Sequence, residues 1–156
     1  MSDEREATAG VIAPPPMIYA GSLVLGVVLH ILRPISFLPS QVARALGLFL
    51  ILAGVVLGPA AYREMRRAGT NIDPDLPATA LVMTGPFRWT RNPLYLSLTL
   101  VYAGITALVN ALWLALLLPL VLVVMRRAVI DREERYLERR FGEEYRQYKE
   151  RVRRWI

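Results

Sequence analysis

The sequence predicts an all-α integral membrane bundle of about four transmembrane helices, followed by an amphipathic helix. Three observations predict it. Hydrophobic residues make up 54% of the 156 residues and the mean hydropathy is positive, a balance too apolar for an ordinary water-soluble domain. Four apolar segments are long enough, or nearly long enough, to cross a bilayer. The arginine residues gather in two other stretches, residues 63–93 and 126–156.

The first two apolar segments are delimited by proline and by charge. Residues 17–32 follow the three prolines at 14–16 and end just before Pro34. This segment is short for a span and needs neighbouring apolar residues or local thinning of the bilayer. Residues 42–62 form a second segment that is long enough to cross without help.

The third and fourth apolar segments, residues 94–109 and 111–124, are separated by a single polar residue, Asn110. So short a connection predicts a tight helical hairpin. Pro119 lies inside the fourth segment and predicts a kink, which a neighbouring helix in a bundle tolerates.

The distribution of arginine predicts the orientation of the bundle. The loop at 63–93 and the segment at 126–156 are strongly basic, whereas the two opposite connections are not. By the positive-inside rule, both termini and the long loop face the cytoplasm of what we take to be a bacterial inner membrane. Residues 1–16 are acidic at the start, lack the basic beginning of a signal peptide, and are expected to form a disordered tail before one domain at 17–156.

Composition excludes several functions. The chain has no cysteine, so disulfides, thiolate metal sites and cysteine nucleophiles are excluded, and we expect no metal. The formal net charge of +6 suits anionic membrane lipids better than nucleic acid, because the arginines flank apolar segments. The one histidine, His30, lies in the first apolar segment and is interpreted as a packed bundle residue.

Residues 126–156 carry an apolar stripe at helical spacing. Most arginines fall on the opposite side, which predicts one amphipathic helix lying on anionic headgroups. The stripe consists of Ile130, Leu137, Phe141, Tyr145, Tyr148, Val152 and Trp155.

Two glutamates do not fit this amphipathic pattern. Glu134 projects from the apolar stripe and Glu133 borders it. A carboxylate facing hydrocarbon costs about 3 kcal/mol even on lenient insertion scales, so each needs a partner. One interpretation is a structural ion pair with Arg88, Arg91 or Arg127. The other is that the glutamates bind a polar ligand between this helix and the loop.

The loop at 63–93 ends in "TGPFRWTRNPLYL", residues 84–96, which places arginine, asparagine and aromatic residues where the third apolar segment begins. A loop of this length inside a compact protein is usually functional or disordered. Its many apolar residues favour an ordered, functional loop.

This motif, followed after the hairpin by "IDREERYLERRFGEEYRQYKERV", resembles the isoprenylcysteine carboxyl methyltransferase and phospholipid methyltransferase group. These are small integral membrane enzymes that use S-adenosylmethionine. The resemblance covers residue 69 to the last residue, and the pairing of Asn-Pro-x-Tyr with Glu-Glu is its most specific part. It implies methyl transfer to a lipophilic acceptor at the cytoplasmic membrane face, with S-adenosylhomocysteine as product.

The resemblance also implies the cofactor-binding residues, in a cofactor loop at 63–93 and a covering helix at 126–156. Carried over by position, they are Thr79, Ala80, Leu81, Val82, Phe87, Arg91, Asn92, Pro93, Leu94, Tyr95, Glu133 and Glu134. Phe87, Trp89 or Tyr95 can pack on adenine or face the sulfonium. Pro93 begins the third helix, whose free amide groups favour an anion.

The acceptor is left open between a prenylcysteine-like carboxylate, a phospholipid amine and a small thiol. Asn92 stands where the prenylcysteine enzymes have histidine. Their arginine for a substrate carboxylate is replaced by Val129 or Ala128, which leaves Arg127 as a nearby candidate for substrate binding. Glu133 and Tyr95 are the candidates for assisting proton removal. The alternative is a non-catalytic membrane scaffold or assembly protein that retains the fold.

Overall fold

A computed structural model describes residues 10, 12–73 and 76–155. The described residues form helices and no strands, in the order α2 (Pro15–Leu32), α3 (Ser40–Arg67), η1 (Gly85–Arg88), α4 (Pro93–Val109), α5 (Leu112–Met125), η2 (Arg126–Ile130), α6 (Asp131–Phe141) and α7 (Glu143–Arg151). The predicted all-α membrane bundle is therefore confirmed. Most of the expected N-terminal tail, residues 1–9 and 11, lies outside the described residues.

The four apolar segments correspond to α2, α3, α4 and α5. Their predicted ends agree with the helices within two residues, except that α3 continues past residue 62 to Arg67. Three helical stretches are long and apolar enough to cross a membrane: Pro15–Leu32, Ser40–Arg67 and Leu112–Phe141. Helix α4 is apolar but has only 17 residues. The proline residues at 15 and 16 belong to α2, so this helix begins slightly earlier than the sequence suggested.

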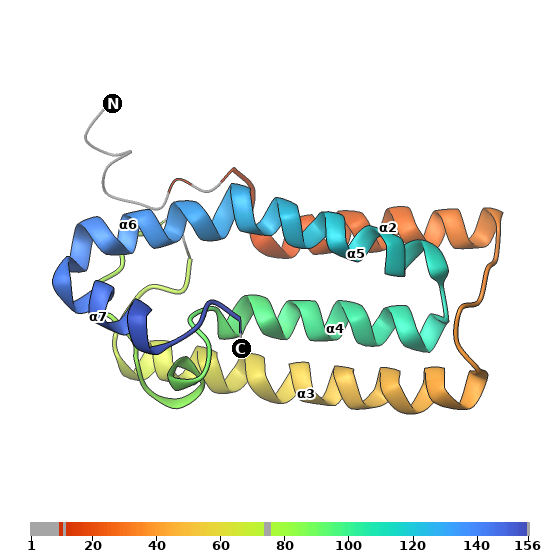
Figure 1. Ribbon diagram of the computed structural model, residues 1–156, viewed down its shortest axis with the longest axis horizontal. Coiled ribbons are helices and arrows are strands. Elements are labelled where there is room, and N and C mark those ends of the chain that lie inside the picture. Colours follow the sequence, from red (N-terminus) through yellow and green to blue (C-terminus); the bar gives the residue numbers. More distant parts are fainter. Residues whose placement is uncertain (1–9, 11, 74–75, 156) are drawn as a thin grey trace.

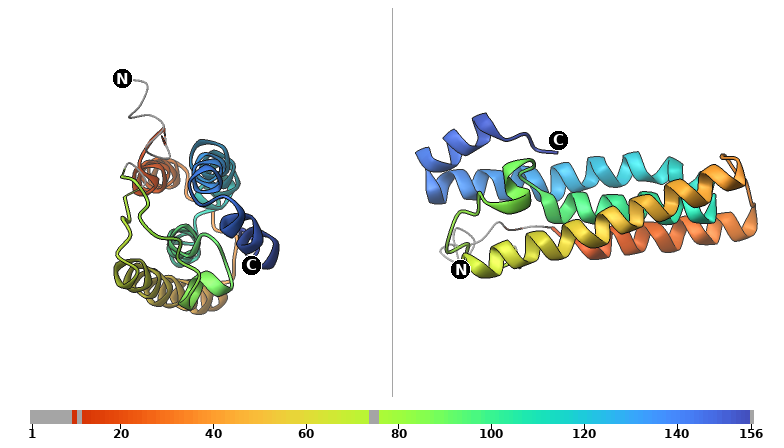
Figure 2. Two further views of the ribbon diagram at one scale, coloured as in Figure 1. Left: turned by 90° about the vertical axis from the view of Figure 1, so that its left-hand side faces the viewer. Right: turned by 90° about the horizontal axis from the view of Figure 1, so that it is seen from below.

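The four long helices run along the long axis of the molecule (Figure 1). Helix α4 packs mainly on α3, and α2 packs mainly on α5. In the end view of Figure 2, α4 lies between α3 on one side and the α2 and α5 pair on the other. The start of α2, the end of α3, the start of α4 and helices α6 and α7 all lie at one end of the bundle (Figure 1).

Small residues allow α3 and α4 to approach closely. A Cβ atom added at Gly104 would lie 2.8 Å from the Gly47 carbonyl oxygen, and one added at Gly54 would lie 2.9 Å from the Ser97 carbonyl oxygen. The Ser97 hydroxyl donates a hydrogen bond of 2.8 Å to the Gly54 carbonyl. Close backbone contact of this kind is how membrane helices gain packing energy without a hydrophobic driving force.

We expect Gly104→Ala to lower the free energy of unfolding by about 1–3 kcal/mol, because the new methyl group would push α3 and α4 apart. Unfolding by SDS, followed by circular dichroism, measures this. Gly21→Ala is the matched control, since a Cβ at Gly21 meets no atom within 4 Å. Equal stability of the two variants would show that the α3–α4 contact is looser than described.

The opposite end of the bundle is fastened by Asn110. This residue has a left-handed backbone (φ 54°) between α4 and α5. Its Oδ1 accepts hydrogen bonds from the amides of Phe37 and Leu38 at 3.1 and 3.0 Å, and its Nδ2 donates to the Leu38 carbonyl at 2.7 Å. Asn110, which the sequence placed at the turn of the predicted helical hairpin, therefore also fixes the connection between α2 and α3.

The C-terminal amphipathic segment differs in shape from the single helix expected. It begins as a direct continuation of α5, through the π-helical turn η2 into α6, so these elements form one rod (Figure 1). Gly142, with φ 55°, ends α6, and α7 turns back toward the bundle. The stripe is therefore divided among η2, α6, α7 and the residues that follow α7, and Ile130, Tyr145 and Tyr148 are buried against protein.

Candidate functional site

The long loop is ordered by hydrogen bonds to its own residues and to the helices after α5. The Ala78 amide donates to the Tyr136 hydroxyl at 2.9 Å, and the Tyr148 hydroxyl donates to the Phe87 carbonyl at 2.7 Å. Burial raises the pKa of the Tyr148 phenol, so it stays protonated and able to donate. The loop is thereby held over the inner faces of α6 and α7.

The segment after α7, residues 152–155, runs back to the turn that precedes α4. We call it the return segment. The Arg91 amide donates to the Arg153 carbonyl at 3.0 Å. The Thr90 hydroxyl and the Asn92 side-chain amide both donate to the Arg154 carbonyl at 3.0 Å. The turn that contains the Arg-Asn-Pro motif is therefore fixed by residues 62 to 64 positions away in the sequence.

Glu134 is neutralised by two arginines. Arg154 donates from Nε to Oε1 at 3.0 Å and from Nη2 to Oε2 at 2.7 Å, and this bonding to Glu134 raises the pKa of the Arg154 guanidinium. Arg91 reaches the same carboxylate only through Nη2, which lies 3.1 Å from Oε1. The interpretation of a structural ion pair therefore holds for Glu134, with Arg91 as one partner and Arg154 as the other.

Arg91 retains donors that no residue described by the structure satisfies. Its side chain is only 9% exposed, and its Nε and Nη1 atoms are buried without a hydrogen-bond partner. Unsatisfied donors of a buried guanidinium are costly, so their position indicates where an anionic group would bind.

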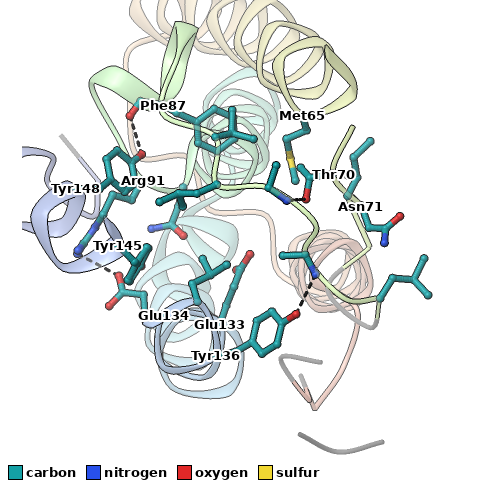
Figure 3. Close-up of a pocket in the computed structure, with 18 of the residues that line it drawn as sticks. Met65, Thr70, Asn71, Phe87, Arg91, Glu133, Glu134, Tyr136, Tyr145 and Tyr148 are labelled. Atoms are coloured by element: carbon teal, nitrogen blue, oxygen red, sulfur yellow. Dashed lines mark hydrogen bonds and ion pairs between the residues drawn. The ribbon is translucent and has the colours of Figure 1, made fainter. Parts of the chain in front are cut away.

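Glu133 has a different environment from its neighbour. Its Oε2 accepts a hydrogen bond from the Tyr95 hydroxyl at 2.9 Å, and it forms no ion pair with any residue that the structure describes. In Figure 3, Glu134 turns toward Arg91, whereas Glu133 points into the space between α6 and the loop.

Two connected chambers lie at this end of the bundle. The polar chamber, of about 80 Å³, lies between the loop and helices α6 and α7 (Figure 3). The lateral chamber, of about 830 Å³, lies between the first residues of α2, the last part of α3 and the first part of α4. Both chambers are lined by Met65, Ile72, Asp73, Phe87, Arg91, Asn92 and Glu133.

Most of the residues implied by the resemblance line these chambers. Those around the polar chamber are Ala80, Leu81, Val82, Phe87, Arg91, Asn92, Glu133 and Glu134. Those around the lateral chamber are Phe87, Arg91, Asn92, Pro93, Leu94, Tyr95 and Glu133. The structure thus brings together the loop, the start of α4 and the glutamate pair.

Three candidates lie elsewhere. Thr79 lines neither chamber, because its amide donates to Thr70 Oγ1 at 3.1 Å and its hydroxyl to the Gly69 carbonyl at 2.8 Å. Trp89 is 74% exposed and lines neither chamber. Arg127 is exposed on η2, also away from both.

Sequence reasoning missed several residues of the site. Tyr136, Tyr145 and Tyr148 line the polar chamber, although the apolar stripe had assigned the last two to the membrane surface. Arg154 was not singled out, because its contact with Glu134 requires the reversal at Gly142. The glycine itself, a residue that commonly ends a helix, is the local signal in the sequence that could have indicated the reversal.

The fold and the chambers define an integral membrane helical protein with polar side chains gathered around a cavity at one end of its bundle. A family model described as "Phospholipid methyltransferase" matches residues 42–144, about two thirds of the chain, and covers α3 to the start of α7. The chain therefore belongs to the phospholipid methyltransferase family, as its motifs indicated, and is a membrane methyltransferase.

One relative and the solved structures complete the comparison. An "Uncharacterized protein" of Haemophilus influenzae (strain ATCC 51907 / DSM 11121 / KW20 / Rd) is 46% identical over 65 residues, which span 40% of this chain and 100% of the relative. No solved structure matches the chain.

Proposed function

We propose that the protein transfers a methyl group from S-adenosylmethionine to the amine of a lipophilic acceptor at the cytoplasmic membrane face. Membership of the family supports methyl transfer. The observation that carries the proposal is that one site contains two unpaired donors of buried Arg91 and a glutamate, Glu133, that has no cationic partner among the described residues.

These groups complement the charges of S-adenosylmethionine, which has one carboxylate, an α-ammonium group and a cationic sulfonium. The Nε and Nη1 atoms of Arg91 suit the carboxylate, since guanidinium–carboxylate pairs form the stronger class of hydrogen bond. Glu133 suits a cationic group, and Phe87 offers an aromatic ring on both chambers. When bound, the sulfonium would supply an activated methyl group.

The lateral chamber suits a lipophilic acceptor. Its volume, about 830 Å³, lies within the range of small-molecule pockets, roughly 300–1,000 Å³. Apolar residues from three membrane helices line it, among them Pro59, Leu94 and Leu98. An acceptor with a hydrocarbon chain can therefore bind with its polar end near Glu133.

The charges around the lateral chamber favour an amine over a carboxylate. Arg91 is the only arginine or lysine among its described lining residues. Val129 and Ala128 are the two candidates for the position where the resembling enzymes hold a substrate carboxylate with arginine. Val129 is fully buried in the apolar core, and Ala128 packs against that core. A carboxylate acceptor would therefore have no cation of its own.

Glu133 is placed to accept a proton from an ammonium acceptor. The proton must leave before the nitrogen lone pair can form the new bond to carbon, while the bond between that carbon and sulfur breaks. The Tyr95 hydroxyl orients the carboxylate by donating to its Oε2. A positioned base of this kind contributes about 10²–10⁴-fold to rate.

The orientation is part of the proposal. The site lies at the end of the bundle that carries the arginines of the loop, α6 and α7, which by the positive-inside rule faces the cytoplasm of a bacterial inner membrane. The exposed arginines of α6, such as Arg135 and Arg139, would contact anionic lipid headgroups.

Calorimetry with S-adenosylhomocysteine on detergent-purified protein tests the cofactor site. We expect binding by the wild type, and an affinity about 10–100-fold lower in Arg91→Ala, because the carboxylate loses its charged donors. Asn92→Ala should weaken binding less, through the turn that Asn92 fixes to Arg154. Arg88→Ala, on the same loop but outside both chambers, is the control.

No detectable heat at millimolar S-adenosylhomocysteine would contradict the proposal and favour a scaffold protein that retains the fold. The acceptor is tested separately, by methyl transfer to vesicles that contain an amino phospholipid, a prenylcysteine or a lipophilic thiol. Transfer to the thiol or the carboxylate instead of the amine would overturn the choice of acceptor while leaving the cofactor site intact.

A further inference from the structure

The two arginines that contact Glu134 do so unequally. Arg154 binds both carboxylate oxygens, at 3.0 and 2.7 Å, and its Nη2 also lies 3.0 Å from Asp131 Oδ1. Arg91 lies near one oxygen only, through one nitrogen. The side chain of Arg154 is 24% exposed, whereas those of Arg91 and Glu134 are 9% and 8% exposed.

This inequality determines how many donors Arg91 has left. Guanidinium and carboxylate groups prefer to pair through two parallel hydrogen bonds. Arg154 already donates to both oxygens of Glu134, and Arg91 contacts only Oε1, which it shares with Arg154. Its Nε and Nη1 atoms remain buried and unpaired, on the wall shared by the polar and lateral chambers.

We propose that Arg154 is a positioning residue for the methyl donor: it holds Glu134 so that Arg91 stays free to bind the donor's carboxylate. The inference rests on the proposed function and assigns a role to the return segment. Without Arg154, Glu134 would turn to pair with Arg91 through two bonds and would take up a donor that the ligand needs. Arg154 itself lines neither chamber and acts only through Glu134 and Arg91.

Two ligands separate this role from a purely structural one. S-adenosylhomocysteine contains the amino-acid carboxylate, whereas 5′-methylthioadenosine has the same nucleoside and sulfur without it. We expect Arg154→Gln to weaken binding of S-adenosylhomocysteine about tenfold and to change binding of 5′-methylthioadenosine less than twofold. A general loosening of the site would weaken both ligands equally and would overturn the inference.

A second substitution should reverse the effect. In Arg154→Gln with Glu134→Gln, the carboxylate that would capture Arg91 is gone, so the affinity for S-adenosylhomocysteine should return to within about threefold of the wild type. A double variant that binds as weakly as Arg154→Gln alone would contradict the mechanism. This rescue is measured by binding and needs no turnover.

Arg153→Gln is the matched control. It removes the same charge from the return segment, and its side chain is exposed, while the carbonyl that accepts from the Arg91 amide is retained. If Arg154→Gln fails to fold, Arg154→Lys gives the same test, because lysine keeps the charge but cannot occupy both oxygens; an unchanged ratio of the two affinities would overturn the inference. If the wild type binds neither ligand, the proposed function itself is wrong.

Discussion

Glu133→Gln is expected to lower the turnover number by about 100-fold or more, which is the loss in rate expected when a general base is removed. The substitution keeps the shape of the side chain and its hydrogen bond from Tyr95 but removes the negative charge that would accept a proton. It should also weaken binding of cationic S-adenosylmethionine more than binding of S-adenosylhomocysteine, whose sulfur is neutral. Steady-state methyl transfer to an amino phospholipid, together with calorimetry for the two nucleosides, measures both effects.

Glu138→Gln is the control for this prediction, because Glu138 lies on the same helix and pairs with Lys149 at 3.4 Å away from the site. If turnover in Glu133→Gln stays within twofold of the wild type, Glu133 is not the group that accepts the proton. In that case the lateral chamber would contain no proton acceptor other than Asp73 among its described residues.

Glu134→Ala is expected to act on stability, lowering the free energy of unfolding by about 3 kcal/mol or more, because it leaves buried cations unpaired. Among the described residues, Arg91 would lose its one ion pair and Arg154 would keep only Asp131. SDS-induced unfolding followed by circular dichroism measures the loss. Glutamine at this position should be milder, since it still accepts hydrogen bonds.

The matched control is Glu143→Ala on α7. Glu143 also pairs with an arginine, Arg146, at 2.9 Å, but both side chains are more than half exposed, and such pairs contribute about 0–1 kcal/mol. A similar loss in both variants would mean that the Glu134 cluster is more hydrated than its burial indicates. We therefore expect the two adjacent glutamates to have separable roles, Glu133 in reactivity and Glu134 in folding.

The bundle and half of the site could be predicted from the sequence because both depend on local patterns. Hydropathy and proline placement gave α2 to α5, and the motif around Arg91 and Asn92 identified the turn before α4. The cost of a carboxylate on an apolar stripe pointed to Glu133 and Glu134. These inferences need only neighbouring residues or one helical period.

The other half of the site depends on the reversal of the chain at Gly142. Helical periodicity in the sequence does not predict such a reversal. A stripe counted along one axis places Tyr145 and Tyr148 on the same straight helix as Leu137. After the reversal, these tyrosines instead reach the polar chamber from a second helix, α7. Arg154 reaches Glu134 only because the return segment runs back toward the turn before α4. In one continuous helix it would lead away from that turn. Thr79 lies outside both chambers for a different reason: its amide and its hydroxyl form hydrogen bonds within the loop.

The π-helical turn η2 has a consequence for how the chain tolerates length changes. A π-turn holds one residue more than a regular α-turn, so a deletion within 126–130 can be absorbed by restoring a regular α-turn. Inserting a further residue there would instead rotate everything beyond it by about 100°, and both glutamates would swing away from Arg91 and Tyr95. The rotation of α6 relative to α5 is therefore set by five residues, and we expect insertions to be less tolerated there than a single deletion.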